Sequence, residues 1–192
     1  MSPTKKEQSA VTTAHLLDVA REMFAESGFS GVGLEDVAAR SGVTRGAVYH
    51  HFKSKNGLFA AVLDLVAERV ADAVSDAASR ADTDWGQLVD GCHAFVDAAC
   101  SDAHRQILLV DGPAVLGWAT WRESDARHSG RLLREGLAEL LGLSGASADP
   151  AAVMLSGAMN EAALWLARAD AGPQDRRDAH AMLDRLLGAL RT

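Results

Sequence analysis

Residues that could bind a polyanion are concentrated in one stretch of the chain, "GVTRGAVYHHFKSK", residues 42–55. It holds an arginine, a tyrosine, two adjacent histidines and two lysines. Side chains of these types donate hydrogen bonds to phosphate oxygens and to base edges. The chain as a whole is acidic, with a formal net charge of −7 and a pI near 5.4. Such a local concentration of cations predicts a polyanionic partner at this stretch.

The two ends of the chain differ in charge. Residues 1–60 carry seven Lys/Arg and six Asp/Glu, whereas residues 61–192 carry twelve and twenty, so the two parts have net charges of +1 and −8. All four lysines lie within the first 55 residues. We therefore expect a small head, residues 1–54, that binds a polyanion, and a larger acidic body, residues 55–192.

Two short helices are predicted around this stretch. The first runs from Leu34 to Ser41 and is followed by Gly42, and the second runs from Arg45 to Phe52, with Thr44 as its N-cap. Two short helices joined by a tight turn form a helix-turn-helix, whose second helix enters the major groove of DNA with its N-terminal residues at the bases.

The helical period predicts which side chains of the second helix face the core and which face outward. We predict that Ala47, Val48 and Phe52 pack inward, whereas Gly46 lets the helix approach the bases closely. The side chains left for DNA are then those of Thr44, Arg45, Tyr49 and His50. His51 faces another way and is expected to pack against the first helix or to be solvated.

The remaining periodicity is also helical, so the predicted fold class is all-α. Ser54 is predicted to cap the fourth helix, and "GLSGASADP" is predicted to be a loop. The other expected helices span Ser9–Ser27, Lys55–Arg80, Trp85–Cys100, Val115–Leu143, Pro150–Ala169 and Pro173–Leu190. The last two of these helices begin with a proline at N1. A short apolar segment is expected at Arg105–Val110.

The segments "LLDVAREMFAESGF" and "GLEDVAARSGVTRGAVYHHFKSKNGLFAAVL", within residues 11–65, resemble the DNA-binding head of the tetracycline-repressor (TetR/AcrR) family. The resemblance implies a three-helix helix-turn-helix head and a larger helical body for ligand binding and dimerisation. It also implies phosphate contacts from Thr44, Tyr49 and His50, a base contact from Arg45, and a phosphate held by Lys55 at the start of the fourth helix.

The chain departs from the family pattern at two helix starts. Gly33 stands where the family usually has Thr or Ser, and Asn56 stands where it often has Glu. Both changes are expected to loosen a helix end. Lys5 and Lys6 are expected to add phosphate contacts from an N-terminal arm.

A ligand cavity is predicted in the body. Glu161 and Asn160 lie in an otherwise apolar segment, where a carboxylate needs a partner or a cavity. The candidate lining residues are Phe95, Trp118, Trp121, Met154, Asn160, Glu161 and Trp165. Glu161 suggests a cationic or amphipathic aromatic ligand. Ordinary core packing of the aromatic residues, and pairing of Glu161 with an arginine across a dimer interface, remain open.

Two cysteines, Cys92 and Cys100, lie eight residues apart. On one helix this spacing is about 12 Å, too far for a disulfide between them. We expect reduced thiols in a packed core, with a thiol or redox sensor as the alternative function.

The sequence contains no recognisable enzyme motif. Motifs for nucleophilic hydrolases, P-loops, dinucleotide-binding loops and zinc proteases are absent, so no enzyme activity, cofactor or metal is predicted. His15, His128 and His180 are expected on surface faces without a role. The most apolar window, residues 151–167, is interrupted by Asn160 and Glu161, and the first ten residues are polar, so we expect a cytoplasmic protein that does not enter a membrane.

The sequence thus predicts a homodimeric transcriptional regulator. We expect a repressor that leaves a palindromic operator when a small molecule binds, with dimerisation through the last two helices. The competing class is a helical ligand-binding protein whose head docks a protein instead of DNA.

Overall fold

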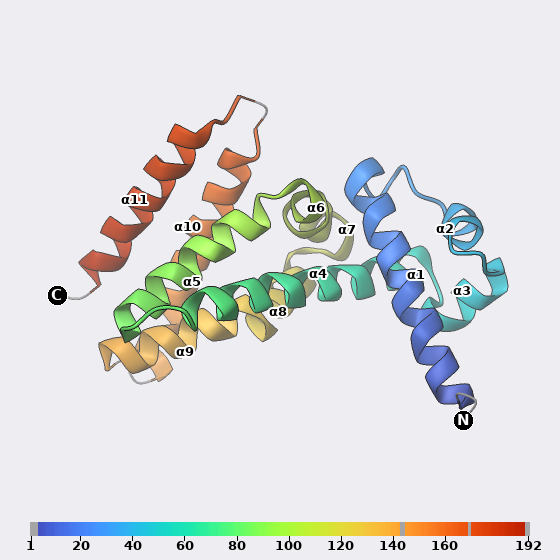
Figure 1. Ribbon diagram of the computed structural model, residues 1–192, viewed down its shortest axis with the longest axis horizontal. Helices are drawn as coiled ribbons and strands as arrows, with labels where there is room; N and C mark the ends of the chain where they lie inside the picture. Colours follow the sequence, from blue (N-terminus) through green and yellow to red (C-terminus); the bar gives the residue numbers. More distant parts are fainter. Residues whose placement is uncertain (1–3, 143–144, 169, 191–192) are drawn as a thin grey trace.

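The computed structural model describes residues 4–142, 145–168 and 170–190, and every regular element within these ranges is a helix. A small head of three helices lies at one end of the molecule and a larger helical body at the other, with helix α4 running from one to the other (Figure 1). The all-α prediction is confirmed. Within the described ranges, none of the helices has the length and apolar character needed to span a membrane.

The head consists of α1 (Lys5–Ser27), α2 (Leu34–Arg40) and α3 (Arg45–Phe52). Helix α1 begins before the predicted Ser9 because Thr4 and Glu7 form a capping box, in which each side chain accepts a hydrogen bond from the other residue's backbone N–H. The predicted bounds of α3 are confirmed, and Thr44 caps it by accepting a hydrogen bond from the N–H of Ala47 at 3.2 Å.

Helix α4 (Lys55–Ala78) belongs to both parts of the molecule. Ser54 caps its start by accepting a hydrogen bond from the N–H of Gly57 at 3.0 Å, as predicted. Phe59 is fully buried in the head, where its ring centroid lies 5.2 Å from those of Phe24 and Phe29. The first turns of α4 are therefore anchored by an aromatic cluster of the head.

The body packs α5 along the second half of α4, and the remaining helices close around this pair. Buried side chains from all its layers form a core continuous with that of the head. Its elements are α5 (Asp84–Ala99), α6 (Asp102–Arg105), the π-helix η1 (Gln106–Asp111), α7 (Gly112–Leu116), α8 (Trp118–Arg127), α9 (Ser129–Leu141), α10 (Gly145–Leu166) and α11 (Pro173–Ala189).

Two sequence predictions about the body are wrong. The single helix expected from Val115 is divided into α7, α8 and α9, because Gly117 adopts a φ of +81° and His128 leaves helical geometry. The loop expected at residues 142–150 is helical from Gly145, and Pro150 lies inside α10 instead of at its N1 position. Alanines at 146, 148, 151 and 152 favour helix strongly enough to outweigh the Gly, Ser and Pro signals.

Some predicted helix ends fall outside the described residues. Leu143 and Ala169 are among them, and the side chains of Lys5 and Lys6 are likewise not described. Pro173 does stand at N1 of α11, as predicted.

A hydrogen bond from η1 provides a second link between body and head. The short apolar segment predicted here forms a π-helix, with Ile107, Leu108 and Leu109 buried. At its end, Asp111 accepts a hydrogen bond from the backbone N–H of Phe29 at 2.7 Å. This contact joins the loop after α1 to the body independently of α4.

We predict that Asp111→Ala lowers the free energy of unfolding by about 1–3 kcal/mol, since a hydrogen bond to a charged acceptor is lost and a partly buried N–H is left unpaired. Urea denaturation measures the change. Asp102→Ala, at a fully exposed carboxylate on α6, is the matched control and should change little. Equal effects of the two substitutions would contradict the link.

Candidate nucleic-acid interface and ligand cavities

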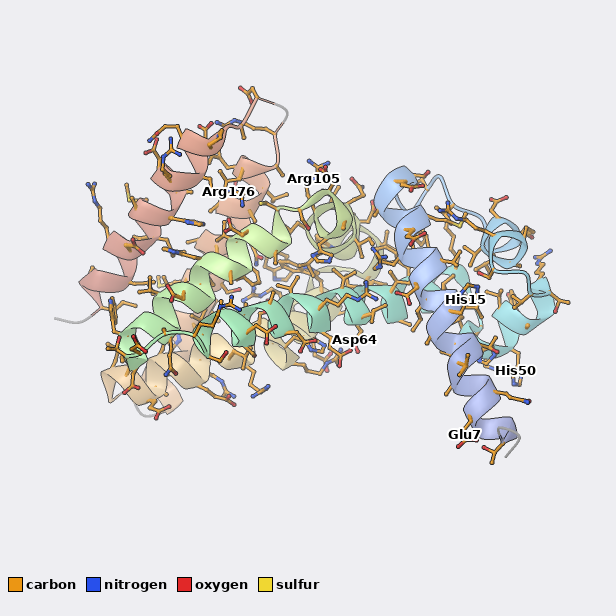
Figure 2. All side chains as sticks on the ribbon, viewed as in Figure 1. Glu7, His15, His50, Asp64, Arg105 and Arg176 are labelled. Atoms are coloured by element: carbon orange, nitrogen blue, oxygen red, sulfur yellow. The ribbon has the colours of Figure 1, made fainter. Side chains whose placement is uncertain are left out.

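Helix α3 presents a polar face to solvent. Val48 is fully buried beneath it, whereas Thr44, Arg45, Gly46, Tyr49 and His50 are exposed, as the helical period predicts. Figure 2 places His50 on the head, well away from the body helices. The exposed face therefore carries a guanidinium, a phenol, an imidazole and the helix N-terminus, all of which can donate hydrogen bonds to a nucleic acid.

Arg45 is only loosely held in the free protein. Its Nη1 lies 2.9 Å from Oε1 of Glu35 on α2, and both side chains are more than half exposed. An exposed ion pair of this kind contributes at most about 1 kcal/mol. The guanidinium can therefore exchange this carboxylate for another acceptor at little cost.

Lys55 is fixed at the start of α4. Its ammonium lies 4.2 Å from the centroid of the Phe29 ring, a cation–π contact that holds it close to the helix N-terminus. The first turn of α4 has no acidic side chain. The ammonium and the free N–H groups thus create positive potential at one point, suited to a phosphate.

The start of α2 lacks the side-chain cap that a hydroxyl at position 33 would provide. Asp36 accepts a hydrogen bond from the N–H of Gly33 at 3.1 Å, which is only the reciprocal half of a capping box. His51 contacts α1, as predicted, with Nδ1 3.1 Å from Oγ1 of Thr13. Among the described residues no group of three or more His, Cys, Asp or Glu is arranged to hold a metal ion.

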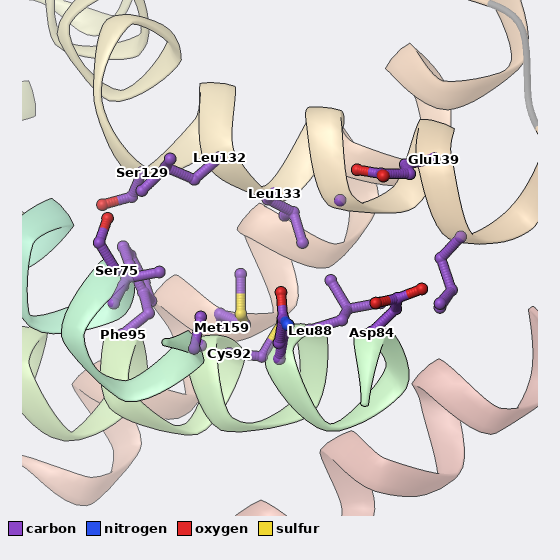
Figure 3. A pocket seen from close by; sticks show the side chains of 16 residues that line it. Ser75, Asp84, Leu88, Cys92, Phe95, Ser129, Leu132, Leu133, Glu139 and Met159 are labelled. Atoms are coloured by element: carbon purple, nitrogen blue, oxygen red, sulfur yellow. The ribbon is translucent and has the colours of Figure 1, made fainter. Parts of the chain in front are cut away.

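The first of two cavities in the body lies between α4, α5 and α9, with Met159 of α10 at its back (Figure 3). Its volume is about 230 Å³. Leu88, Phe95 and Leu133 form part of its apolar wall, and all three are buried. Serine hydroxyls and carboxylates stand toward its ends. This arrangement suits a small molecule with an apolar body and polar ends.

The second cavity lies between α7, α8 and α10 and has a volume of about 560 Å³. The rings of Trp118 and Trp121 stand 5.0 Å apart, and Arg122 lies within 6 Å of both. Val153, Gly157 and Leu164 of α10 complete the wall. Gly157 and Leu164 are exposed and Val153 is 58% exposed, so this cavity opens on the outward face of α10.

The predicted ligand residues do not form one cluster. Phe95 lines the first cavity, whereas Trp118, Trp121, Asn160 and Glu161 line the second. Met154 and Trp165 line neither cavity and project from α10 into solvent. Glu161 is itself exposed. Its carboxylate is therefore not stranded in an apolar interior.

Two histidines that the sequence left without a role join separate elements. His128 Nε2 lies 2.9 Å from Asp64 of α4, and His180 of α11 lies 3.1 Å from Asp97 of α5. The His180 ring also stacks on that of His93, with centroids 4.1 Å apart. Because these partners are far apart in sequence, no local spacing could have identified them.

Neither thiol has the environment of a reactive cysteine. Burial raises the pKa of Cys92 to about 12, and the nearby Asp184 carboxylate adds to the shift. Burial also raises the pKa of Cys100, although Arg176 lies 3.9 Å from its sulfur. Because the thiolate is the nucleophile, a raised pKa disfavours alkylation and oxidation of both cysteines.

We predict that the native protein reacts with iodoacetamide at pH 8 at least about a hundredfold more slowly than the urea-unfolded chain, because burial and a high pKa suppress the thiolate. Mass spectrometry over time measures the modification. Rapid alkylation of Cys100 in the native protein, with a change in DNA binding, would instead favour a thiol sensor.

Comparisons with known proteins agree with this architecture. The sequence family described as bacterial regulatory proteins of the tetR family matches residues 16–62, and the tetracyclin repressor-like C-terminal domain matches residues 85–190. The transcriptional regulator AcrR of Shigella flexneri is 38% identical over 72 residues, which span 38% of this chain and about a third (34%) of AcrR.

Solved structures are similar over nearly the whole chain. A TetR-family regulator from Pectobacterium atrosepticum is 30% identical, with a TM-score of 0.76, over 98% of this chain and 97% of that one. RolR, crystallised with resorcinol, is 19% identical with a TM-score of 0.71 over 97% and 94% of the two chains, which shows a shared fold.

Proposed function

Because the chain belongs to the TetR family of transcriptional regulators, we propose that it is a homodimeric repressor that leaves a palindromic operator when a small molecule binds. The observation that carries the proposal is the exposed row of donors along α3, from Thr44 and Arg45 to Tyr49 and His50, together with the positive start of α4. A surface that docks a protein would not need phosphate-binding groups at a helix start.

The contacts with DNA divide into two kinds. Arg45, held only by an exposed ion pair, reads a base, because a guanidinium matches the two acceptors of guanine. Lys55, together with the start of α4, holds a phosphate. Thr44, Tyr49 and His50 hold further phosphates, and Gly46 lets α3 approach the bases.

We predict different binding profiles for two substitutions. Arg45→Ala should cost about 1–3 kcal/mol and relax the preference at one position of each half-site, whereas Lys55→Ala should weaken all sequences alike and flatten the salt dependence. Fluorescence anisotropy over a panel of operator variants and salt concentrations separates the two. Identical profiles would show that these roles are wrongly assigned.

Selection of bound fragments from a random DNA pool is the test of the proposed function. A palindromic consensus, with half-sites one helical turn of about 34–36 Å apart or a multiple of it, is the expected result. Failure to enrich any sequence, at low salt as well, would favour a head that docks a protein.

An exposed apolar surface on α10 and α11 supports a homodimer. Leu183 and Leu187 of α11 are buried against the body, whereas Leu186 and Leu190 of the same helix are exposed. The dimer surface that we propose consists of Val153, Met154 and Trp165 of α10 with Met182, Leu186 and Leu190 of α11, all exposed large hydrophobic residues. A two-fold pair of these helices would bury this surface.

We predict that the protein sediments as a dimer at micromolar concentration and that Met154→Glu shifts it toward monomer, because a carboxylate would be buried at the interface. Val110→Glu, at an exposed apolar residue of η1, is the matched control and should leave the dimer intact. A wild-type monomer would contradict the proposed surface.

The effector site that we propose is the first cavity. Val74, Ser75 and Ala78 in the second half of α4 line it, while Leu58 and Phe59 at the other end of α4 are fully buried in the head. A helix of 24 residues spans about 36 Å, so a small tilt at the cavity moves the recognition helix appreciably.

The coupling between ligand binding and DNA binding follows from the geometry of the proposed dimer. Two recognition helices that no longer match successive grooves lose DNA affinity, and DNA must then weaken ligand binding by the same factor. The second cavity, with Trp118, Trp121, Asn160 and Glu161, opens on the face of α10 that the dimer would cover. It is therefore the less suitable effector site.

A further inference from the structure

We propose that the ligand of the first cavity is a compact organic monocation, with its ammonium group between Asp84 and Glu139 and its apolar body among the buried side chains of α5, α9 and α10. This inference rests on the ligand-release function proposed above and specifies its ligand class. The sequence had suggested Glu161 as the partner of a cationic ligand, but Glu161 lines the other cavity. The proposed cation site is therefore at Asp84 and Glu139 instead.

The polar groups of the cavity are separated by its apolar middle. Figure 3 shows the side chains of Ser75 and Ser129 at one end of the view and the carboxylates of Asp84 and Glu139 toward the other, on opposite walls. Such a division selects a molecule that is charged at one end only.

The charge at the acidic end is uncompensated. Asp84 and Glu139 are both exposed, their carboxylates have no hydrogen-bond or ion-pair partner among the described residues, and no Lys or Arg lines the cavity. Glu135, also on α9, is by contrast paired with Arg131 at 2.8 Å. The mouth of the cavity therefore has negative potential, which repels anions and attracts a cation.

Asp84 and Glu139 lie at opposite ends of their helices, so the helix dipole affects their two carboxylates differently. Asp84 lies in the first turn of α5, where the helix dipole already stabilises a negative charge. Glu139 lies in the last turn of α9, at the negative end of the dipole, where a carboxylate is disfavoured without a counter-charge. A bound ammonium would supply that counter-charge.

The volume limits the size of the ligand. At about 230 Å³ the cavity exceeds the roughly 150 Å³ of an engineered apolar cavity that takes up benzene and lies below the roughly 300 Å³ at which pockets for drug-sized ligands begin. One aromatic ring with a short alkylamine chain fits this range. A metal ion does not suit the site, because the described residues offer no cluster of three ligands.

The experiment uses full-length protein and three probes with the same carbon skeleton: 4-phenylbutylamine, 4-phenylbutanol and 4-phenylbutyrate. Calorimetry should give a Kd for the amine about tenfold lower than for the alcohol, with the acid weakest, and the preference should shrink as salt is raised. Release of the selected DNA duplex is measured with the same three probes.

Three variants locate the ammonium. Asp84→Asn and Glu139→Gln should each reduce the preference for the amine, and the double variant should bind the amine and the alcohol equally well. Binding of the alcohol should stay unchanged in all of them. Glu135→Gln, at a carboxylate of α9 outside the cavity, should behave as wild type, and thermal denaturation checks that each variant is folded.

The outcomes separate this inference from the proposed function. If the alcohol or the acid binds as tightly as the amine, or if none of the three binds, the ligand class is wrong. If the amine binds but Glu139→Gln has no effect, the placement is wrong. If the amine binds as expected but does not release DNA, the inference stands and the ligand-release function fails.

Discussion

The burial of the two ends of helix α4 in two different environments is the constraint on which the rest of the molecule depends. Leu58 and Phe59 are fully buried in the head, and Val74 and Ser75 line the first cavity. Since an α-helix is stiff over about 36 Å, neither end can be repacked without a response at the other. The cavity and the head therefore share α4, which is the direct structural connection between them.

Electrostatics keep the two binding surfaces distinct. Residues 1–60, which comprise the head and the start of α4, carry a net charge of +1 and concentrate their cations around α3 and the start of α4, whereas residues 61–192 carry −8. DNA is therefore attracted to the head alone, because the acidic body repels phosphates within a Debye length of about 8–10 Å. The same acidic character at Asp84 and Glu139 makes the cavity unsuited to anions. The monocation and the operator that we propose differ in charge, so neither would be attracted to the other's site.

The head could be predicted from sequence and the cavities could not, for a physical reason. Local residue preferences and the helical period involve only a few neighbouring residues. They were enough to predict the caps at Thr44 and Ser54, the bounds of α3 and the outward face of Tyr49 and His50. The cavities depend on which helices meet, and that is decided by contacts far apart in the chain. Phe95 and Trp118 were therefore expected in one cavity although they line two, and Asp84 and Glu139, 55 positions apart, were not recognised.

The contact between α4 and α7 limits how the head can respond. A Cβ atom at Gly112 would lie 2.7 Å from Leu63 of α4 and 2.9 Å from Trp121, so only glycine fits between them. Trp121 is in turn held by a hydrogen bond to the carbonyl of Leu108 at 2.7 Å, and the neighbouring Asp111 holds the backbone of Phe29. The middle of α4 is thus fixed against η1, α7 and α8. In the ligand switch that we propose, a ligand that displaced the far end of α4 would rotate the helix about this contact, and the start of α4, with the head attached, would move in the opposite sense.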